Sequence, residues 1–353
     1  MLNSNPPFAE EIRRFFYEQF SEEGEAIALA GSQALGYATS RSDIDLVLLI
    51  KPSSGLSQSD MSFLTQLISG RRTEILILTP GTIEERFART KAEKYNNLGY
   101  SDRRFIERIS TAIPIVGEQR WNAILTSFDR DTYVAQMLRD NLTLASKSFD
   151  DLVGLYVDGD YINAVDAVRF LLQVELEALL CTFGDTGDRR RWLLRRAGLI
   201  KDLDPKVTSG FTEYNFNMIN NKFSTNFEWI ENAMRFHQYI QCQILIKKYH
   251  ADIGNLICSD YNTHSSAFIT PSLLFLDCVN ETWYVKTAKE SRVIDETSSF
   301  ILMICHLGQN INNIAYYFSL ISPALATSSD TIKFLSSRID QLVDLGLLTK
   351  NAS

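Results

Sequence analysis

Residues 31–50, GSQALGYATSRSDIDLVLLI, break the pattern expected of a buried strand. Two acids, Asp43 and Asp45, alternate with Ile44 and Leu46 at the start of an apolar run. Because successive side chains of a strand point to opposite faces, both carboxylates aim to one side while Ile44 and Leu46 are buried. Carboxylates held this close repel each other unless a cation lies between them. Mg²⁺ is the natural occupant, since it takes one or two carboxylates and completes its shell with substrate phosphates and water.

Gly31 and Ser32 precede the two acids and follow the short apolar run AIALA, residues 26–30. A glycine just past a strand lets the backbone approach a ligand closely. A helix that starts there points free N–H groups at an anion, and the Ser32 hydroxyl adds a contact to a β- or γ-phosphate. The segment therefore predicts a phosphate-binding turn ahead of a metal-binding strand.

A third acid, Glu74, lies within the apolar run RRTEILIL, residues 71–78. If this run forms a strand beside the first one in the right register, Glu74 lies next to the aspartates. There it would act as a base, provided that it comes within hydrogen-bond reach of an acceptor hydroxyl. The alternative is a glutamate on an edge strand that faces water.

The ordered combination Gly-Ser, Asp-x-Asp and a later strand acid resembles the nucleotidyltransferase superfamily, which includes DNA polymerase β, kanamycin nucleotidyltransferase and the aminoglycoside adenylyltransferases. Ala34, Gly36 and Ser42 fit its small-molecule and minimal branch. The resemblance implies transfer of a nucleoside monophosphate, with ATP the expected donor and pyrophosphate released. It also implies two Mg²⁺ ions, with Glu74 as base, metal ligand or both. The implied metal and catalytic residues are Asp43, Asp45 and Glu74, and the implied nucleotide-binding residues are Gly31, Ser32 and Ser42.

The hydrophobic patterns predict an α+β protein of three domains. Residues 1–127 read as a small mixed-sheet nucleotidyltransferase domain, with a helix at 8–20, strands at 26–30, 43–50 and 71–80, and a helix at 61–69. Pro80 and Gly81 are expected to end the third strand. Residues 128–252 are almost wholly helical in pattern and predict an antiparallel bundle. A resemblance to kanamycin-type nucleotidyltransferases implies that such a bundle closes over the nucleotide. Residues 253–353 predict a hairpin followed by three helices, a winged-helix-like domain.

The segment around Trp192 is rich in arginine, with five arginines between residues 189 and 196. Guanidinium groups suit phosphate, so Arg189 and Arg191 are candidates to bind the triphosphate or an acidic acceptor. The alternative is a solvated helix anchored by Trp192. The helical region loosely resembles the C-terminal domain of kanamycin-type nucleotidyltransferases, and no catalytic residue is carried across.

The C-terminal pattern VIDETSSFILMICHLGQNINNIAYYF is similar to PqqD-like domains, which bind leader peptides of ribosomally made, modified peptides. Such domains add the peptide as a strand to a sheet edge. A DNA-binding winged helix shares much of the pattern, but residues 291–353 hold four Lys or Arg against five Asp or Glu, a poor footprint for phosphate backbones. Peptide binding, a structural or dimerising role and, least favoured, DNA binding stay open, as does a homodimer.

Composition limits the class of protein. The formal net charge of −8 argues against nucleic-acid binding as the main role. The five cysteines are odd in number and widely spaced, so buried reduced thiols are expected rather than disulfides or zinc. The four histidines are scattered without ligand spacing. No signal-like core or run of ~18 apolar residues occurs, which predicts a cytoplasmic protein without a membrane partner.

Two functions from different classes follow. The first is Mg²⁺-dependent nucleotidyl transfer, with AMP the expected group, to a hydroxyl of a small molecule or peptide. The alternative is an antitoxin-type enzyme that modifies a protein, or a regulatory interaction protein that uses the same fold.

Overall fold

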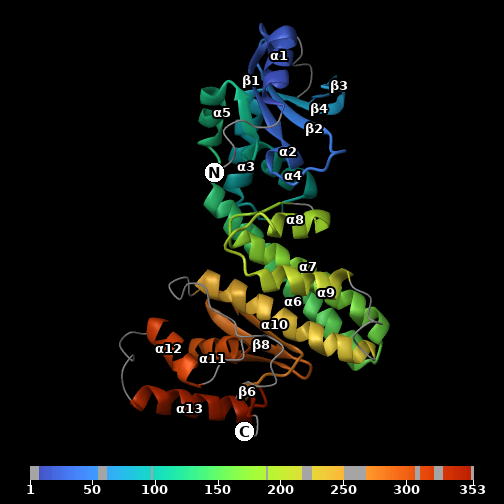
Figure 1. Ribbon diagram of the computed structural model, residues 1–353. Coiled ribbons are helices and arrows are strands. Elements are labelled where there is room, and N and C mark those ends of the chain that lie inside the picture. Colours follow the sequence, from blue (N-terminus) through green and yellow to red (C-terminus); the bar gives the residue numbers. More distant parts are fainter. Residues whose placement is uncertain are drawn as a thin grey trace. The chain divides into compact units, whose positions relative to one another are not determined.

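The computed structural model describes residues 8–54, 62–96, 98–187, 190–216, 225–249, 268–306, 311–321 and 329–350 (Figure 1). The chain forms two compact units. The N-terminal unit contains residues 1–136 and 186–199, and the C-terminal unit contains residues 137–185 and 200–353. The arginine-rich segment thus belongs to the N-terminal unit. Division into three domains stays a prediction.

The N-terminal unit is built on a mixed five-stranded sheet of order β3-β4-β2-β1-β5. Strand β2 runs antiparallel to β1 and parallel to β4, while β5 and β3 form the antiparallel edges. Its elements are α1 (Ala9–Phe20), β1 (Gly24–Ala30), α2 (Gly31–Ala34), β2 (Ile44–Ile50), β3 (Ser62–Ile68), β4 (Arg71–Leu78), α3 (Pro80–Ala92), α4 (Tyr100–Ser110), β5 (Ile113–Val116), α5 (Glu118–Leu125), the 3₁₀ turn η1 (Arg190–Trp192) and α8 (Leu193–Ala197).

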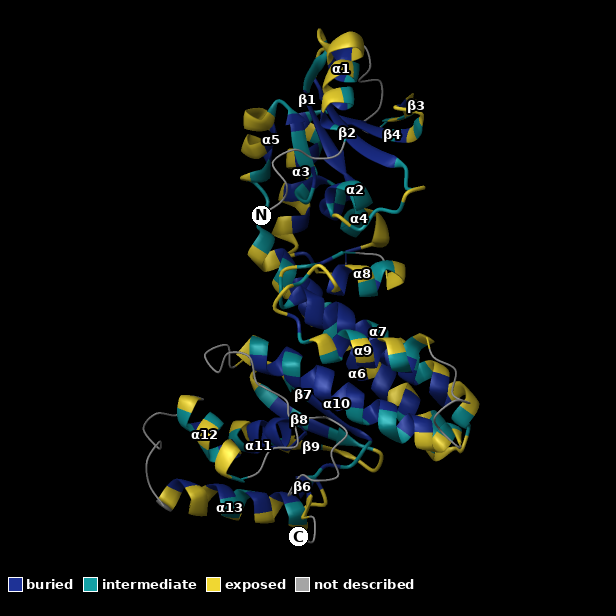
Figure 2. Cartoon of the chain, in the orientation of Figure 1, coloured by how far each residue is buried: buried dark blue, intermediate teal, exposed yellow. Residues whose placement is uncertain are grey.

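The sheet has two distinct faces because its side chains alternate. One face packs on α1, and its buried cluster includes Ile12 and Phe16 of the helix with Ile44, Leu46 and Ile75 of the strands. Every residue of β2 is buried, as the dark ribbon in Figure 2 shows. Asp45 therefore lies on the opposite face, in a row with the buried side chains of Val47 and Leu49.

The helix predicted at residues 61–69 is wrong, because residues 62–68 form strand β3, antiparallel to β4. The connection is the two-residue turn Ser69-Gly70, in which both residues have positive φ, 51° and 73°. Such a turn matches the twist of a hairpin and pairs the flanking strands. Strand pairing therefore overrides the local apolar spacing that favoured a helix.

The structure adds two details to the predicted sheet, namely where β4 ends and a fifth strand, β5. Strand β4 ends at Leu78 and Pro80 is the first residue of α3, where a proline costs no hydrogen bond. Thr79 caps this helix by accepting from the backbone N–H of Thr82 at 3.3 Å. Strand β5 was not predicted, and Pro114 within it is tolerated because β5 lies at the edge of the sheet.

The C-terminal unit combines long helices with small antiparallel sheets. Helix α6 (Arg130–Val157) begins in the N-terminal unit and continues here, and α7 packs against α10. The sheets have the orders β7-β8-β9 and β6-β10. The remaining elements are α7 (Tyr161–Cys181), α9 (Pro205–Phe216), α10 (Asn226–Tyr249), β6 (Phe268–Ile269), β7 (Leu274–Val279), β8 (Thr282–Thr287), β9 (Ser291–Ile294), α11 (Glu296–His306), α12 (Ile311–Ile321), α13 (Ser329–Asp344) and β10 (Thr349–Lys350).

The hairpin and the three following helices lie where the sequence predicts them, while the winged-helix-like assignment stays a prediction. Cys181, Cys242 and Cys305 are buried and Cys278 is half-buried, and these four described cysteines form no disulfide, while Cys258 lies outside the described residues. Among the helices described, none has the length and apolar character required to cross a bilayer.

Candidate active site

Gly31 is placed directly against Asp45 by the pairing of β1 with β2. Ala30 is the register partner of Asp45, and Gly31 follows with φ of +64°, a conformation that favours glycine. A Cβ atom at Gly31 would lie 2.2 Å from Oδ2 of Asp45. The glycine is required here both for its backbone conformation and for the space that the carboxylate occupies. Ser32 follows within α2, a single helical turn.

Ser42 holds the loop that leads into β2. Its hydroxyl oxygen accepts a hydrogen bond from the backbone N–H of Thr39 at 2.9 Å and lies 3.1 Å from the Thr39 hydroxyl. The strand begins at Ile44, so Asp43 is the last residue of the loop, whereas Asp45 lies within β2. The two aspartates still line one cavity of about 90 Å³ together with Gly31, Ser32 and Ser42. We call it the Asp43–Asp45 cavity.

Arg108 of α4 pairs with Asp45 inside the protein. Its Nη2 donates to Oδ1 of Asp45 at 2.7 Å, and the two side chains are only 9% and 12% exposed. Charge-assisted contacts of this length are the strong class of hydrogen bond. The guanidinium therefore supplies the positive charge next to Asp45 in this structure.

Glu74 is the register partner of Asp45 on the neighbouring parallel strand. Paired residues of adjacent strands share a face of the sheet, so Glu74 lies beside Asp45 as the sequence suggested. Its carboxylate accepts from Nη2 of Arg72 at 2.8 Å and is 30% exposed. Glu74 lines a different cavity, of about 390 Å³, which we call the Glu74 cavity.

Three charged residues of α4 at the site were not predicted from the sequence. Arg104, Glu107 and Arg108 all line the Asp43–Asp45 cavity, and Arg104 and Arg108 also line the Glu74 cavity. They stand at positions i, i+3 and i+4, the spacing that puts side chains on one face of a helix. Charged residues with this spacing beside the apolar Phe105, Ile106 and Ile109 were the signal available in the sequence.

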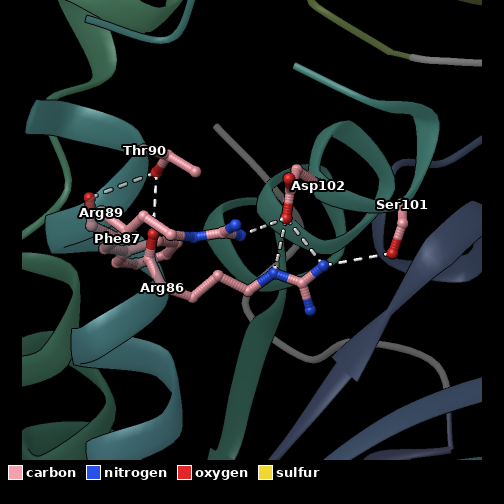
Figure 3. Close-up of polar contacts among 6 residues, drawn as sticks. All are labelled: Arg86, Phe87, Arg89, Thr90, Ser101 and Asp102. Carbon is pink, nitrogen blue, oxygen red and sulfur yellow. Dashed lines mark hydrogen bonds and ion pairs between the residues drawn. The ribbon is translucent and has the colours of Figure 1, made fainter. Parts of the chain in front are cut away.

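Helix α4 is fastened to α3 by the carboxylate of Asp102, which accepts from Nε of Arg86 and Nη2 of Arg89, both at 2.8 Å (Figure 3). Nη2 of Arg86 also donates to the Ser101 hydroxyl at 3.1 Å. The Arg86 guanidinium lies over the Phe105 ring, 4.2 Å from its centroid. These contacts hold Arg86 at the wall of the Glu74 cavity.

The arginine-rich segment contributes Arg191 and Trp192 to the Asp43–Asp45 cavity, while Arg189 lies outside the described residues. The Trp192 ring packs on Tyr37 with centroids 5.9 Å apart, and Arg195 donates to the Tyr37 carbonyl at 3.0 Å. Trp192 thus anchors this segment, as the alternative interpretation expects, while Arg191 faces the cavity. A further cavity of about 590 Å³, the arginine cavity, adjoins through Ser42 and Asp43 and is lined by Arg41, Arg71, Arg72 and Arg191.

The oxygen ligands at the Asp43–Asp45 cavity fit a divalent cation that is completed by a substrate. Asp43, Asp45 and Ser32 offer hard oxygen donors to one cavity, the set that Mg²⁺ prefers. Within the described residues, no three acidic, histidine or cysteine side chains gather as a metal centre. A cation held here would therefore take part of its shell from phosphate or water.

Residues 9–98 match the family model described as the nucleotidyltransferase domain. The match contains Gly31, Ser32, Asp43, Asp45 and Glu74 but ends before α4. The protein is therefore an enzyme of the nucleotidyltransferase type, which transfers a nucleoside monophosphate from a nucleoside triphosphate. No curated protein sequence matches the chain significantly.

Among solved structures, the chain is similar to a nucleotidyltransferase-like protein from Exiguobacterium sibiricum 255-15. The two are 13% identical, and the alignment covers 70% of this chain and 80% of that one with a TM-score of 0.39.

Proposed function

We propose that the protein transfers AMP from ATP to a hydroxyl group of a small molecule or peptide in a Mg²⁺-dependent reaction. The observation that carries the proposal is that Gly31, Ser32, Asp43 and Asp45 line one cavity beside the arginine cavity. The first cavity offers oxygen ligands and a close backbone approach for phosphates. The second offers the guanidinium groups of Arg41, Arg71 and Arg191 to the rest of a triphosphate.

The residues of the chain have distinct roles in this reaction. Asp43 and Asp45 hold Mg²⁺, whose charge stabilises the attacking and leaving oxygens when it is bound. The acceptor oxygen forms a bond to the α-phosphorus, the bond from that phosphorus to the bridging oxygen breaks, and pyrophosphate leaves. The acceptor proton passes to a base, for which we propose Glu74. As the register partner of Asp45, Glu74 lies one strand away from the proposed metal.

The defining experiment measures pyrophosphate release and label transfer with ATP, GTP, CTP and UTP, Mg²⁺ and a panel of acceptors. Asp43→Asn and Asp45→Asn should each lower the rate by several orders of magnitude, because metal-held charge stabilisation is the largest part of such catalysis. Asp151→Asn, at an exposed position of α6, is the control for loss of a carboxylate. Activity that survives both active-site changes contradicts the proposal.

The alternative function is modification of a partner protein. The molecule that receives the nucleotide label distinguishes it from the small-molecule reaction. With cell extract as the source of acceptors, a small labelled product supports the small-molecule reaction, and one labelled protein band supports the antitoxin-type reaction.

A peptide partner for the C-terminal unit remains a proposal, and the sheet β7-β8-β9 supports it. Among the described residues, β9 pairs only with β8, so its other edge is open to an added strand. Calorimetric titration of the full chain with short peptides encoded beside its gene tests this role. Absence of saturable binding would leave the domain a structural or dimerising one.

A further inference from the structure

The Glu74 cavity has a charge balance that indicates what it binds. Its wall contains three arginines, Arg86, Arg104 and Arg108, and one carboxylate, Glu74. Its volume, about 390 Å³, is within the range of sites for small organic molecules. A polycationic acceptor would meet like charge here, whereas an anion would meet opposite charge.

Arg104 differs from the other two arginines of this cavity in its partners. Arg86 is held by Asp102 and Arg108 by Asp45. Within the part of the chain that the structure describes, the half-buried side chain of Arg104 makes no ion pair or hydrogen bond. A partly buried guanidinium without a partner loses hydration and gains nothing in return. An anionic group of a ligand would provide the missing partner.

The cavity also presents an apolar surface for the body of a ligand. Phe63 and Tyr100 line it although 61% and 62% of their surfaces are exposed, and the buried Phe105 adds a third ring. Single exposed aromatic side chains are ordinary, but two at one cavity are typical of a binding site. Flat apolar groups pack well on such rings.

We propose that the Glu74 cavity is the acceptor site, and that the acceptor is a hydroxyl-bearing organic anion with an aromatic or similarly flat body. Its carboxylate or phosphate pairs with Arg104, its flat part packs between Phe63 and Tyr100, and its hydroxyl faces Glu74. This assignment rests on the proposed function, and it names the class of acceptor for that reaction.

The test compares three ligands that share a phenol ring and differ in charge: 4-hydroxyphenylacetate, the neutral tyrosol and the cationic tyramine. Equilibrium binding to the full chain is measured by calorimetry without nucleotide. We expect 4-hydroxyphenylacetate to bind at least about tenfold more tightly than tyramine, because one charge-assisted hydrogen bond to Arg104 is enough for a difference of that size. Arg104→Gln should remove that preference, Arg104→Lys should restore part of it, and Arg14→Gln, at an exposed position of α1, should leave it unchanged.

The affinity for a nonhydrolysable ATP analogue with Mg²⁺ is measured on the same variants. If Arg104→Gln weakens only the nucleotide, Arg104 belongs to the donor site and the inference is overturned. Tighter binding of tyramine, equal binding of all three ligands or no saturable binding overturns it as well. Transfer to cationic acceptors that still depends on Asp43 and Asp45 would leave the proposed reaction intact while removing this inference. Anion binding that depends on Arg104 without any transfer would contradict the proposed reaction, and it would leave the cavity an anion-binding site rather than an acceptor site.

Discussion

Arg108 donates to Asp45 at 2.7 Å in a nearly buried ion pair, so a cation of the protein itself lies against a carboxylate proposed to hold Mg²⁺. A buried pair that loses one partner leaves an uncompensated charge, which is more costly than the pair is beneficial. The guanidinium therefore stabilises the charge of Asp45 in this structure, and it would compete with a bound Mg²⁺ for the same carboxylate.

Arg108→Gln should lower the free energy of unfolding by about 3 kcal/mol without divalent cations. Mg²⁺ should recover part of that loss, because it supplies the missing positive charge, and it should stabilise the variant more than the wild type. Chemical denaturation with and without Mg²⁺ measures both effects. Arg89→Gln is the matched control: Arg89 is 54% exposed and Asp102 keeps Arg86, so the loss should stay below about 1 kcal/mol. Equal stabilisation of both proteins by Mg²⁺ would contradict competition at Asp45.

Gly31→Ala should displace the carboxylate of Asp45, since the new Cβ would lie 2.2 Å from Oδ2. Gly159→Ala is matched in backbone strain, with φ of +75° against +64°, but its Cβ has nothing within 4 Å. We expect Gly31→Ala to destabilise the protein by about 1–3 kcal/mol more than Gly159→Ala, from overpacking. Transfer should fall about a hundredfold in Gly31→Ala alone, because catalytic groups are sensitive to small displacements. Similar losses of activity in the two variants would refute a close fit of Gly31 to Asp45.

Glu74→Gln separates the two roles left open for this residue. If Glu74 is the base, the Glu74→Gln variant should transfer about 10²–10⁴-fold more slowly, and its affinity for Mn²⁺ should be unchanged. If Glu74 is a metal ligand, the variant should also bind Mn²⁺ more weakly, which electron paramagnetic resonance of bound Mn²⁺ detects. We expect the first result, because Glu74 lines the Glu74 cavity rather than that of Asp43 and Asp45. Glu25→Gln, another strand glutamate with an arginine partner, controls for the lost ion pair.

His306 should make stability fall in acid. Burial, with smaller contributions from His237 and Arg235, lowers the pKa of His306 to about 3. Below about pH 6.5 the unfolded chain binds a proton that the folded chain does not, so folding loses up to about 1.4 kcal/mol per pH unit down to about pH 3. The stability due to the neutral imidazole is thus fully present above pH 6.5.

Denaturant unfolding from pH 7 to pH 4 measures this slope in the wild type and in His306→Gln. Burial raises the pKa of Glu175, so this carboxyl group makes the folded state more stable as the pH falls, opposite to the effect of His306. Glu175 is present in both proteins, so its effect cancels in the difference between their unfolding free energies. Unfolding free energies that fall equally steeply in the two proteins would exclude His306 as the cause.

Strands β1, β2 and β4 were predictable because each is a short apolar run bounded by turn residues. Strand β3 was not, since six of its seven residues are only partly buried or exposed and its apolar spacing also suits a helix. Its hairpin with β4 outweighs that spacing. Among the site residues, Gly31, Ser32, Asp43 and Asp45 were predictable from their spacing along one segment. Arg104 and Arg108 were not, because nothing within α4 indicates which element it faces.

The sequence alone specified the reaction class, because the Gly-Ser turn, the alternating aspartates and Glu74 follow one another in one short part of the chain, and strand alternation is a local property. The charges and surfaces that meet those acids were set by the tertiary structure. Arg108 lies 63 residues beyond Asp45, and Arg191 lies further still, so only the packing of α4 and of residues 186–199 brings guanidinium groups to the site. The parallel register of β2 and β4 likewise places Glu74 beside Asp45 yet in a separate cavity, which no local pattern encodes.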